Sequence, residues 1–72
     1  MQSALRRVYV VVTDALGAVV ARRYLDGDEV PSWLTMSAGA GSVRCDVYDE
    51  APVCGGRVVA TFVPDGRTWR EH

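Results

Sequence analysis

Residues 8–13 form a run in which neither face of an extended chain is polar. Alternate side chains of a strand point to opposite faces. One face would hold Val8, Val10 and Val12, and the other would hold Tyr9, Val11 and Thr13. A strand at the surface of a small protein normally carries polar residues on its solvated face. We therefore expect this strand to be covered on both faces, either by the rest of the chain or by a partner.

The same run predicts the first arm of a β-hairpin, from about residue 6 to residue 13. Asp14–Gly17 supplies a turn, because Asp bonds to nearby backbone groups and Gly tolerates a positive φ. Residues 18–25 continue the β-branched enrichment and form the second arm. A turn centred within Asp14–Gly17 predicts two cross-strand pairs, Val8 with Arg23 and Tyr9 with Arg22.

Two further strands are predicted in the second half of the chain. Residues 42–48 alternate between apolar and polar, with Val43, Cys45 and Val47 expected to point inward. Residues 57–63 form another strand, which ends at a turn over residues 64–66. We expect residues 1–5 and 67–72 to be flexible or partner-contacting tails.

The segment between the two halves has two interpretations. Pro31 at a first helical position, the acidic residues before it and Gly39 after it favour a short helical turn over residues 31–38. Residues 33–36 also fit a strand that leads into the glycine-rich residues 38–41. We favour the helical turn.

These segments predict one small, mainly β domain over residues 1–72. The expected fold is an antiparallel sheet or a partly open barrel of four to five strands built from two hairpins, with a short helical turn near residues 31–38. A chain of 72 residues buries only about 60–65% of its unfolded surface. Small domains therefore often gain stability from a disulfide, a metal or a partner subunit.

Charge and hydropathy argue against several classes of partner. The net charge of −1 gives no general attraction to nucleic acid or to anionic lipid. No apolar run approaches the roughly 18 residues of a membrane span, and the N-terminal segment has no small-residue cleavage site. We therefore expect a cytoplasmic or virion protein with no membrane partner.

Residues suited to catalysis or metal binding are few. The only histidine is the last residue, His72, and chain ends hold reacting groups poorly. The serines lack a nucleophile-elbow pattern. Asp26, Asp28 and Glu29 lack the further ligands of a calcium loop, so we interpret them as a solvated turn. We predict no enzymatic activity, no cofactor and no metal.

Cys45 and Cys54 have three possible states. Free thiols are favoured, because nothing indicates an oxidising compartment. A disulfide is the next interpretation. A zinc site is the least favoured, because it would need two more ligands.

Arginines and aromatic residues supply the remaining candidates for binding. Arg6, Arg7, Arg22 and Arg23 are candidates for one basic patch, and Arg67 and Arg70 flank Trp69, which could stack on a base. However, the pI of 5.6 lies far below the value of about 9 that is typical of dedicated nucleic-acid binders. We expect Trp33 to lie in the core rather than at an interface, and Trp69 to contact another chain.

The segment Gly27–Trp33, with the sequence Gly-Asp-Glu-Val-Pro-Ser-Trp, resembles a short motif of small proteins from actinobacteria and their phages. The resemblance covers only this segment of the chain. It implies an actinobacterial or phage source, a setting in which small β-rich proteins include virion parts.

We predict a non-catalytic structural or protein-interaction module that oligomerises or docks on a larger assembly, such as a phage capsid or tail. The residues expected to carry the interaction are Val8, Tyr9, Val10, Val11, Arg22, Arg23 and Trp69. The partner would be a second copy of the chain or a larger protein assembly. The alternative function is that of a small regulator, which binds nucleic acid or inhibits a host protein.

Overall fold

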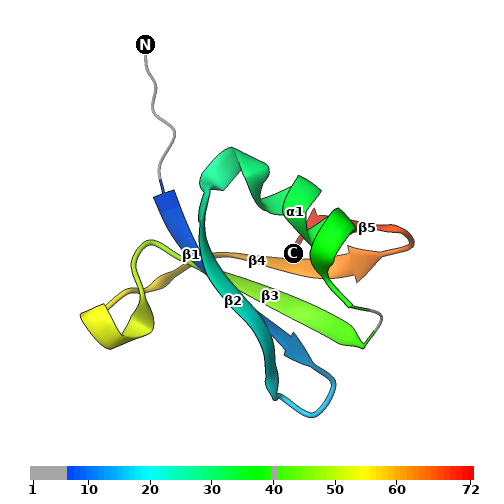
Figure 1. Cartoon of the computed structure of the whole chain (residues 1–72), viewed down its shortest axis with the longest axis horizontal. Helices are drawn as coiled ribbons and strands as arrows, with labels where there is room; N and C mark the ends of the chain where they lie inside the picture. The colour runs from blue at the N-terminus through cyan, green and yellow to red at the C-terminus, as the bar shows by residue number, and fades with distance from the viewer. Residues whose placement is uncertain (1–6, 40) are drawn as a thin grey trace.

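One five-stranded antiparallel sheet with a short helix makes up the computed structural model, which describes residues 7–39 and 41–72 (Figure 1). The strands are β1 (Arg7–Asp14), β2 (Val19–Asp26), β3 (Ser42–Tyr48), β4 (Val58–Asp65) and β5 (Thr68–Glu71). Their order in the sheet is β2-β1-β3-β4-β5, and every neighbouring pair is antiparallel. The predicted mainly β fold is confirmed in its open-sheet form, with five strands.

The turn of the first hairpin is fixed by the side chain of Asp14. Its Oδ1 accepts hydrogen bonds from the backbone N–H groups of Leu16 and Ala18, both at 2.9 Å. Gly17 closes the turn with a φ of 82° and donates its N–H to the Asp14 carbonyl oxygen. The predicted turn residues are therefore confirmed, each with the expected role.

The predicted register of this hairpin is wrong by two residues. Val8 lies opposite Leu25 and Tyr9 lies opposite Tyr24. Gly17 adds one residue to the turn, because the hairpin closes with Asp14 opposite Ala18. A β-bulge adds the second, because the register shifts between Val12 and Thr13 and leaves Val20 without a cross-strand partner. From Ala21 to Asp26 the displacement of two residues keeps each side chain on its predicted face, whereas Val19, on the other side of the bulge, is displaced by one residue and moves to the opposite face.

A second bulge explains why Val43 does not point into the core. Thr13 pairs with Arg44 while Asp14 pairs with Ser42, so that Val43 between them has no partner on β1. Val43 is 43% exposed and Ser42 is buried in its place. The bounds predicted for this strand are confirmed, and so is the burial of Cys45 and Val47.

The last residues of the chain form a strand rather than the expected tail. β4 continues through Asp65, and a turn with Gly66 at a φ of 65° leads into β5. β5 pairs with β4 over Phe62–Asp65, which places Trp69 opposite Pro64. Residues 1–5, the other expected tail, lie outside the described residues.

The helical interpretation of the central segment is confirmed. A 3-10 helix, η1 (Gly27–Glu29), runs directly into α1 (Val30–Ser37), which has its proline in the first turn. Val30 and Leu34 are one helical turn apart and both are buried. The helix ends at Ala38, whose backbone is extended and whose N–H still bonds to the Leu34 carbonyl oxygen.

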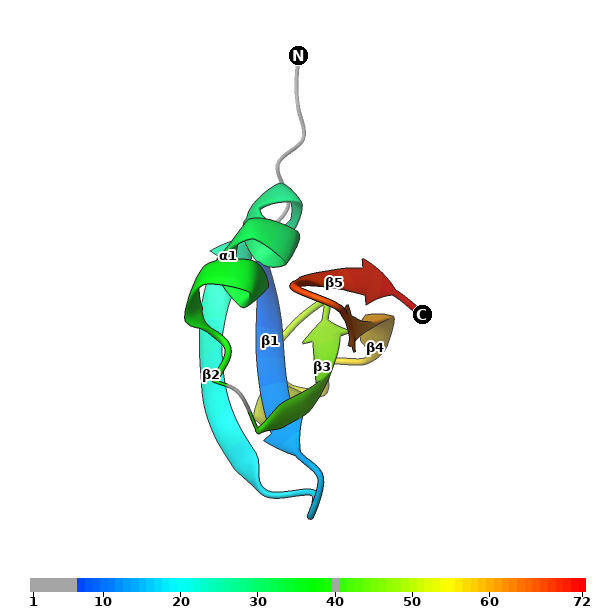
Figure 2. The ribbon, with the colours of Figure 1, turned by 90° about the vertical axis from the view of Figure 1, so that its right-hand side faces the viewer.

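The core lies between α1 and one face of the sheet, which we call the inner face. Its centre is the valine face of β1, and its members are Val8, Val10, Val12, Leu25, Val30, Leu34, Cys45 and Val47. α1 also contacts β5, so the helix and the last strand close the same side of the molecule (Figure 2). Full burial of a side chain such as Leu34 contributes about 2 kcal/mol. β1 is therefore a central strand whose inner face is covered by its own chain.

Candidate protein-interaction surface

The outer face, on the side of the sheet away from α1, holds the second apolar side of β1. Tyr9, Val11 and Thr13 are half-buried there, in contrast to the fully buried valines that alternate with them. The hollow that Tyr9 and Val11 line on this face has no residue of α1 or β5 in its lining. Of the two kinds of cover expected for β1, the rest of the chain therefore supplies full cover only on the inner side.

A hollow of about 350 Å³ opens on the outer face, and we call it the outer groove. Its floor comes from β1, β2 and β3, and one wall comes from η2 (Pro52–Cys54). The lining residues are Tyr9, Val11, Val19, Arg22, Tyr48, Ala51, Pro52 and Val53. All but Arg22 are apolar or aromatic, which is the usual character of a binding groove.

The wall of the outer groove is held by backbone contacts rather than by a large core. The carbonyl oxygen of buried Ala51 accepts hydrogen bonds from the N–H groups of Cys54 and Gly56, at 2.8 and 3.1 Å. A Cβ atom at Gly56 would overlap the backbone carbonyl of Glu50, so glycine is required for this close approach. The loop therefore has one compact shape against the sheet.

Three side chains stack at the end of the outer face next to the groove. The rings of Tyr9 and Tyr24 meet edge to face, with centroids 4.9 Å apart, and the Arg7 guanidinium lies 5.8 Å from the centre of the Tyr24 ring. The Tyr24 hydroxyl donates a hydrogen bond to the Glu50 carboxylate at 3.3 Å. Desolvation and the charge of Glu50 raise the pKa of Tyr24 above its usual value.

Apolar side chains are strongly exposed around the outer groove. Val53 on the wall is 93% exposed, and Val19 on β2 is 53% exposed. Single exposed apolar residues are ordinary, whereas a group of them around a hollow is typical of interaction sites. The outer groove thus combines an apolar floor, an exposed apolar rim and one cation.

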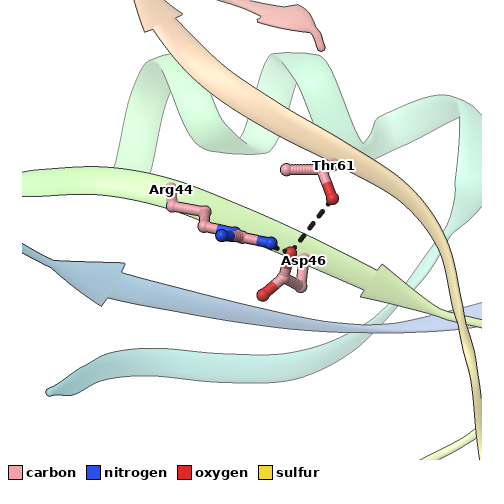
Figure 3. Close-up of polar contacts among 3 residues, drawn as sticks. All are labelled: Arg44, Asp46 and Thr61. Atoms are coloured by element: carbon pink, nitrogen blue, oxygen red, sulfur yellow. Dashed lines mark hydrogen bonds and ion pairs between the residues drawn. The ribbon is translucent and has the colours of Figure 1, made fainter. Parts of the chain in front are cut away.

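The outer face changes character toward β4. Asp46, which pairs with Val11, accepts hydrogen bonds at the same Oδ1 atom from Arg44 Nε and Thr61 Oγ1, both at 3.0 Å (Figure 3). The Asp46 carboxylate is mostly buried and both of its donors are well placed. These three residues form a cross-strand polar contact that borders the apolar half of the face.

The structure brings together only some of the residues predicted to carry an interaction. Tyr9, Val11 and Arg22 all line the outer groove. Val8 and Val10 are buried in the core and cannot contact a partner in the folded chain. Arg23 lies on the inner side of β2, because adjacent residues of a strand point to opposite faces.

Trp69 lies away from the outer groove, on the inner side of β5. It is partly buried against the core and lines a hollow of about 390 Å³ between α1 and β5, together with Pro31, Ser32, Thr35, Met36 and Thr68. Trp33 is also partly buried against the core. The Arg23 guanidinium lies 5.9 Å from the centre of the Trp33 ring.

The predicted basic patch is divided between the two faces of the sheet. Arg7 and Arg22 lie on the outer face, whereas Arg23 stacks on Trp33 on the inner side. Arg6 lies outside the described residues. Arg22 and Arg23 are adjacent in sequence, and adjacent side chains of a strand point to opposite faces of the sheet. The two arginines are separated for this reason.

Sequence reasoning did not find Val19, Pro52 and Val53 as part of the surface. Val19 shares the outer face of β2 with Arg22 only because of the bulge at Val20, which no sequence pattern marks. Pro52 and Val53 depend on how the loop after β3 folds back, and no periodic pattern encodes that geometry.

The two cysteines are free thiols in very different surroundings. Cys45 is buried in β3, and desolvation, with a smaller effect of the Asp46 charge, raises the pKa of its thiol to about 12. Cys54 is exposed on η2. In residues 7–39 and 41–72, no group of three or more His, Cys, Asp or Glu side chains is arranged to hold a metal ion. No helix in those residues is long and apolar enough to span a membrane.

Comparisons of the chain with protein-family models, with curated proteins and with solved structures find no significant match.

Proposed function

We propose that this chain is a non-catalytic protein-interaction module that contacts another protein through the outer groove. The observation that carries the proposal is the apolar outer side of β1, which continues into an exposed rim at Val19 and Val53. Burial of apolar surface is the main favourable term in protein association. Arg22 supplies a cation at the edge of the groove, and arginine is enriched at interfaces.

Nucleic-acid binding receives less support from the geometry. Arg22 lies on the outer face with Arg7, whereas Arg23 lies on the inner side of the sheet. The three guanidinium groups therefore do not form one basic surface. The net charge of −1 supplies no general attraction to phosphate. Protein contact is therefore the function that we retain.

The test is a photo-crosslinking experiment on the full chain in the cells that produce it. A photoreactive phenylalanine analogue replaces Val53 on the rim or, as a matched control, Leu16 in the hairpin turn, because both side chains are 93% exposed. We expect a discrete protein adduct from position 53 and none from position 16. Equal adducts at both positions, or no adduct at either, would contradict the proposal.

A second pair of variants tests the floor of the groove. Val11→Asp places a carboxylate in the apolar floor and should abolish the adduct formed from position 53. Thr13→Asp, on the same face of β1 but outside the groove and opposite Arg44, should leave the adduct unchanged. Both variants are compared at matched thermal stability, so that loss of the adduct does not reflect unfolding.

A further inference from the structure

β2 is an edge strand with one row of backbone groups left for a partner. Within the described chain it pairs with β1 alone. The Asp14 N–H donates to the Ala18 carbonyl oxygen, so the backbone groups of Asp14 point toward β2. Backbone groups alternate in direction along a strand, so those of Val10 also point toward β2, where they meet Arg23. The backbone N–H and C=O groups of Arg22 and Tyr24 consequently point away from β1. An edge of this kind can accept another strand.

The stretch of β2 that is regular enough for pairing is short and well defined. The bulge residue Val20 interrupts it at one end, and η1 turns the chain out of the sheet from Gly27 at the other. Between them lie Ala21–Asp26. The side chains of Arg22, Arg23 and Tyr24 in this stretch are all exposed, so an approaching strand meets no covering element there.

We propose that this edge binds β2 of a second copy of the chain in antiparallel orientation, with Tyr24 on the two-fold axis. The result would be one continuous sheet in which the two outer faces lie side by side. The inference extends the proposed function by naming a partner for the edge of the module, and it does not require the outer groove to be occupied. Such self-complementary pairing gives a closed dimer.

The charges of β2 select this register among the symmetric alternatives. An axis through Arg22 or Arg23 places an arginine directly opposite its own copy, which is destabilising. An axis through Tyr24 places Arg22 opposite Asp26 of the second copy, and symmetry repeats this pair. Neither Arg22 nor Asp26 takes part in an ion pair within the described residues. An axis through Leu25 shortens the paired stretch and loses this match.

A second match of charge arises on the inner side of the same edge. A two-fold axis perpendicular to the sheet keeps the inner faces of both copies on the same side, so Arg23 of the second copy lies opposite Leu25. Leu25 lines a hollow of about 420 Å³ between β2 and α1, and two carboxylates, Asp28 and Glu29, line the same hollow beside the single guanidinium of that copy's own Arg23. The arginine of one copy would therefore enter a hollow that carries two carboxylates of the other.

A charge-swap series on the purified full chain tests the register. The mass in solution is measured by sedimentation velocity from micromolar to millimolar concentration. We expect a dimer for the unmodified chain, and a dissociation constant raised about tenfold or more in Arg22→Asp and in Asp26→Arg, because each creates two like-charged pairs. The double variant Arg22→Asp/Asp26→Arg should restore the dimer. Arg67→Asp, in the exposed turn before β5, is the matched control and should change nothing.

Amide hydrogen exchange on the unmodified chain gives a readout that does not depend on any variant. The Tyr24 N–H should exchange rapidly at low protein concentration and slowly at high concentration. The Arg23 N–H, which points toward β1, should be protected at both concentrations. The Asp26 side chain makes no capping hydrogen bond to η1. The variant Asp26→Arg therefore removes no contact that stabilises this helix.

Three outcomes would overturn the proposal. A chain that stays monomeric at every concentration excludes the dimer but leaves the crosslink from position 53 unaffected. Growth beyond a dimer indicates head-to-tail addition of β2 to β5 instead. A dimer that Val11→Asp dissociates, with no change in Tyr24 exchange, places the contact in the outer groove and supports the proposed function alone.

Discussion

Val12 and Cys45 lie directly opposite each other across β1 and β3, and both side chains are completely buried. This pair stands at the centre of the sheet, where the inner face is covered by α1. Because side chains are buried there, we expect the Cys45 thiol to be unreactive toward thiol reagents. For the same reason, we expect truncation of the buried valines of β1 to lower the free energy of unfolding.

Cys45 should not react with thiol reagents in the folded protein at pH 8, whereas Cys54 should react at once. The pKa of Cys45 is raised to about 12, so almost no thiolate is present, and its side chain is buried, whereas Cys54 is exposed to the reagent. Titration with a chromogenic disulfide reagent should therefore count one thiol before unfolding and two after it. Two fast thiols in the folded chain would contradict the burial of Cys45.

The same thiol should make the protein less stable in alkali. The folded-state pKa of Cys45 lies above the usual value of 9.0, so between pH 9 and about 12 the unfolded chain releases a proton that the folded chain retains. The free energy of unfolding should then fall by at most about 1.4 kcal/mol per pH unit across this window. Urea titrations of the unmodified chain and of Cys45→Ala should show a shallower fall in the variant.

Val10 and Val11 are neighbours in β1 and should respond very differently to truncation. Val10 is fully buried, so Val10→Ala should lower the free energy of unfolding by about 2 kcal/mol. Val11 is half-exposed in the outer groove, and Val11→Ala should cost less than about 1 kcal/mol. Urea unfolding of the two variants provides the measurement, and equal losses would argue against a sheet with one covered face.

The turn of the first hairpin should depend on an oxygen acceptor at residue 14. Asp14→Ala removes the acceptor of two backbone N–H groups and should destabilise the fold by about 1 kcal/mol or more. Asp14→Asn retains a side-chain oxygen and should lose much less. Thermal unfolding of the two variants compares them, and a loss of the same size in both would assign the effect to charge instead.

Gly56 should tolerate no side chain. Gly56→Ala drives a Cβ atom into the Glu50 carbonyl and should cost more than about 2 kcal/mol, or displace η2 from the sheet. Gly39→Ala serves as the control, because a Cβ atom there meets no atom within 4 Å, and its effect should stay within about 0.5 kcal/mol. Calorimetry on both variants measures the difference.

Local patterns were enough to predict the first four strands and the helical turn, because each pattern acts on neighbouring residues. The alternation of residues 42–48 and the proline at the start of α1 both correspond to what the chain does. The register of the hairpin was not predictable in the same way. Val20 and Val43 look like ordinary members of their strands, and only the fit against β1 shows that each is an extra residue.

The surface was less predictable than the fold, for the same reason. Tyr9, Val11 and Arg22 could be named from one strand pair, but the wall of the outer groove comes from a loop whose shape depends on Gly56 and Ala51. The polar residues after Pro64 suggested a tail. They instead form β5, because backbone pairing with β4 does not require apolar side chains.

The strand order has a consequence for how fast the chain folds. β1 and β2 are joined by a tight turn, as are β4 and β5, and a short connection joins β3 to β4, so these pairs form between nearby residues. Among the strand pairs, only the seam between β1 and β3 joins the two halves, and its closure must bring β2 along, together with α1, which contacts β5. Loop closure of this kind dominates folding rates. We therefore expect substitutions at the Val12–Cys45 seam to slow folding, and substitutions in β5 chiefly to accelerate unfolding.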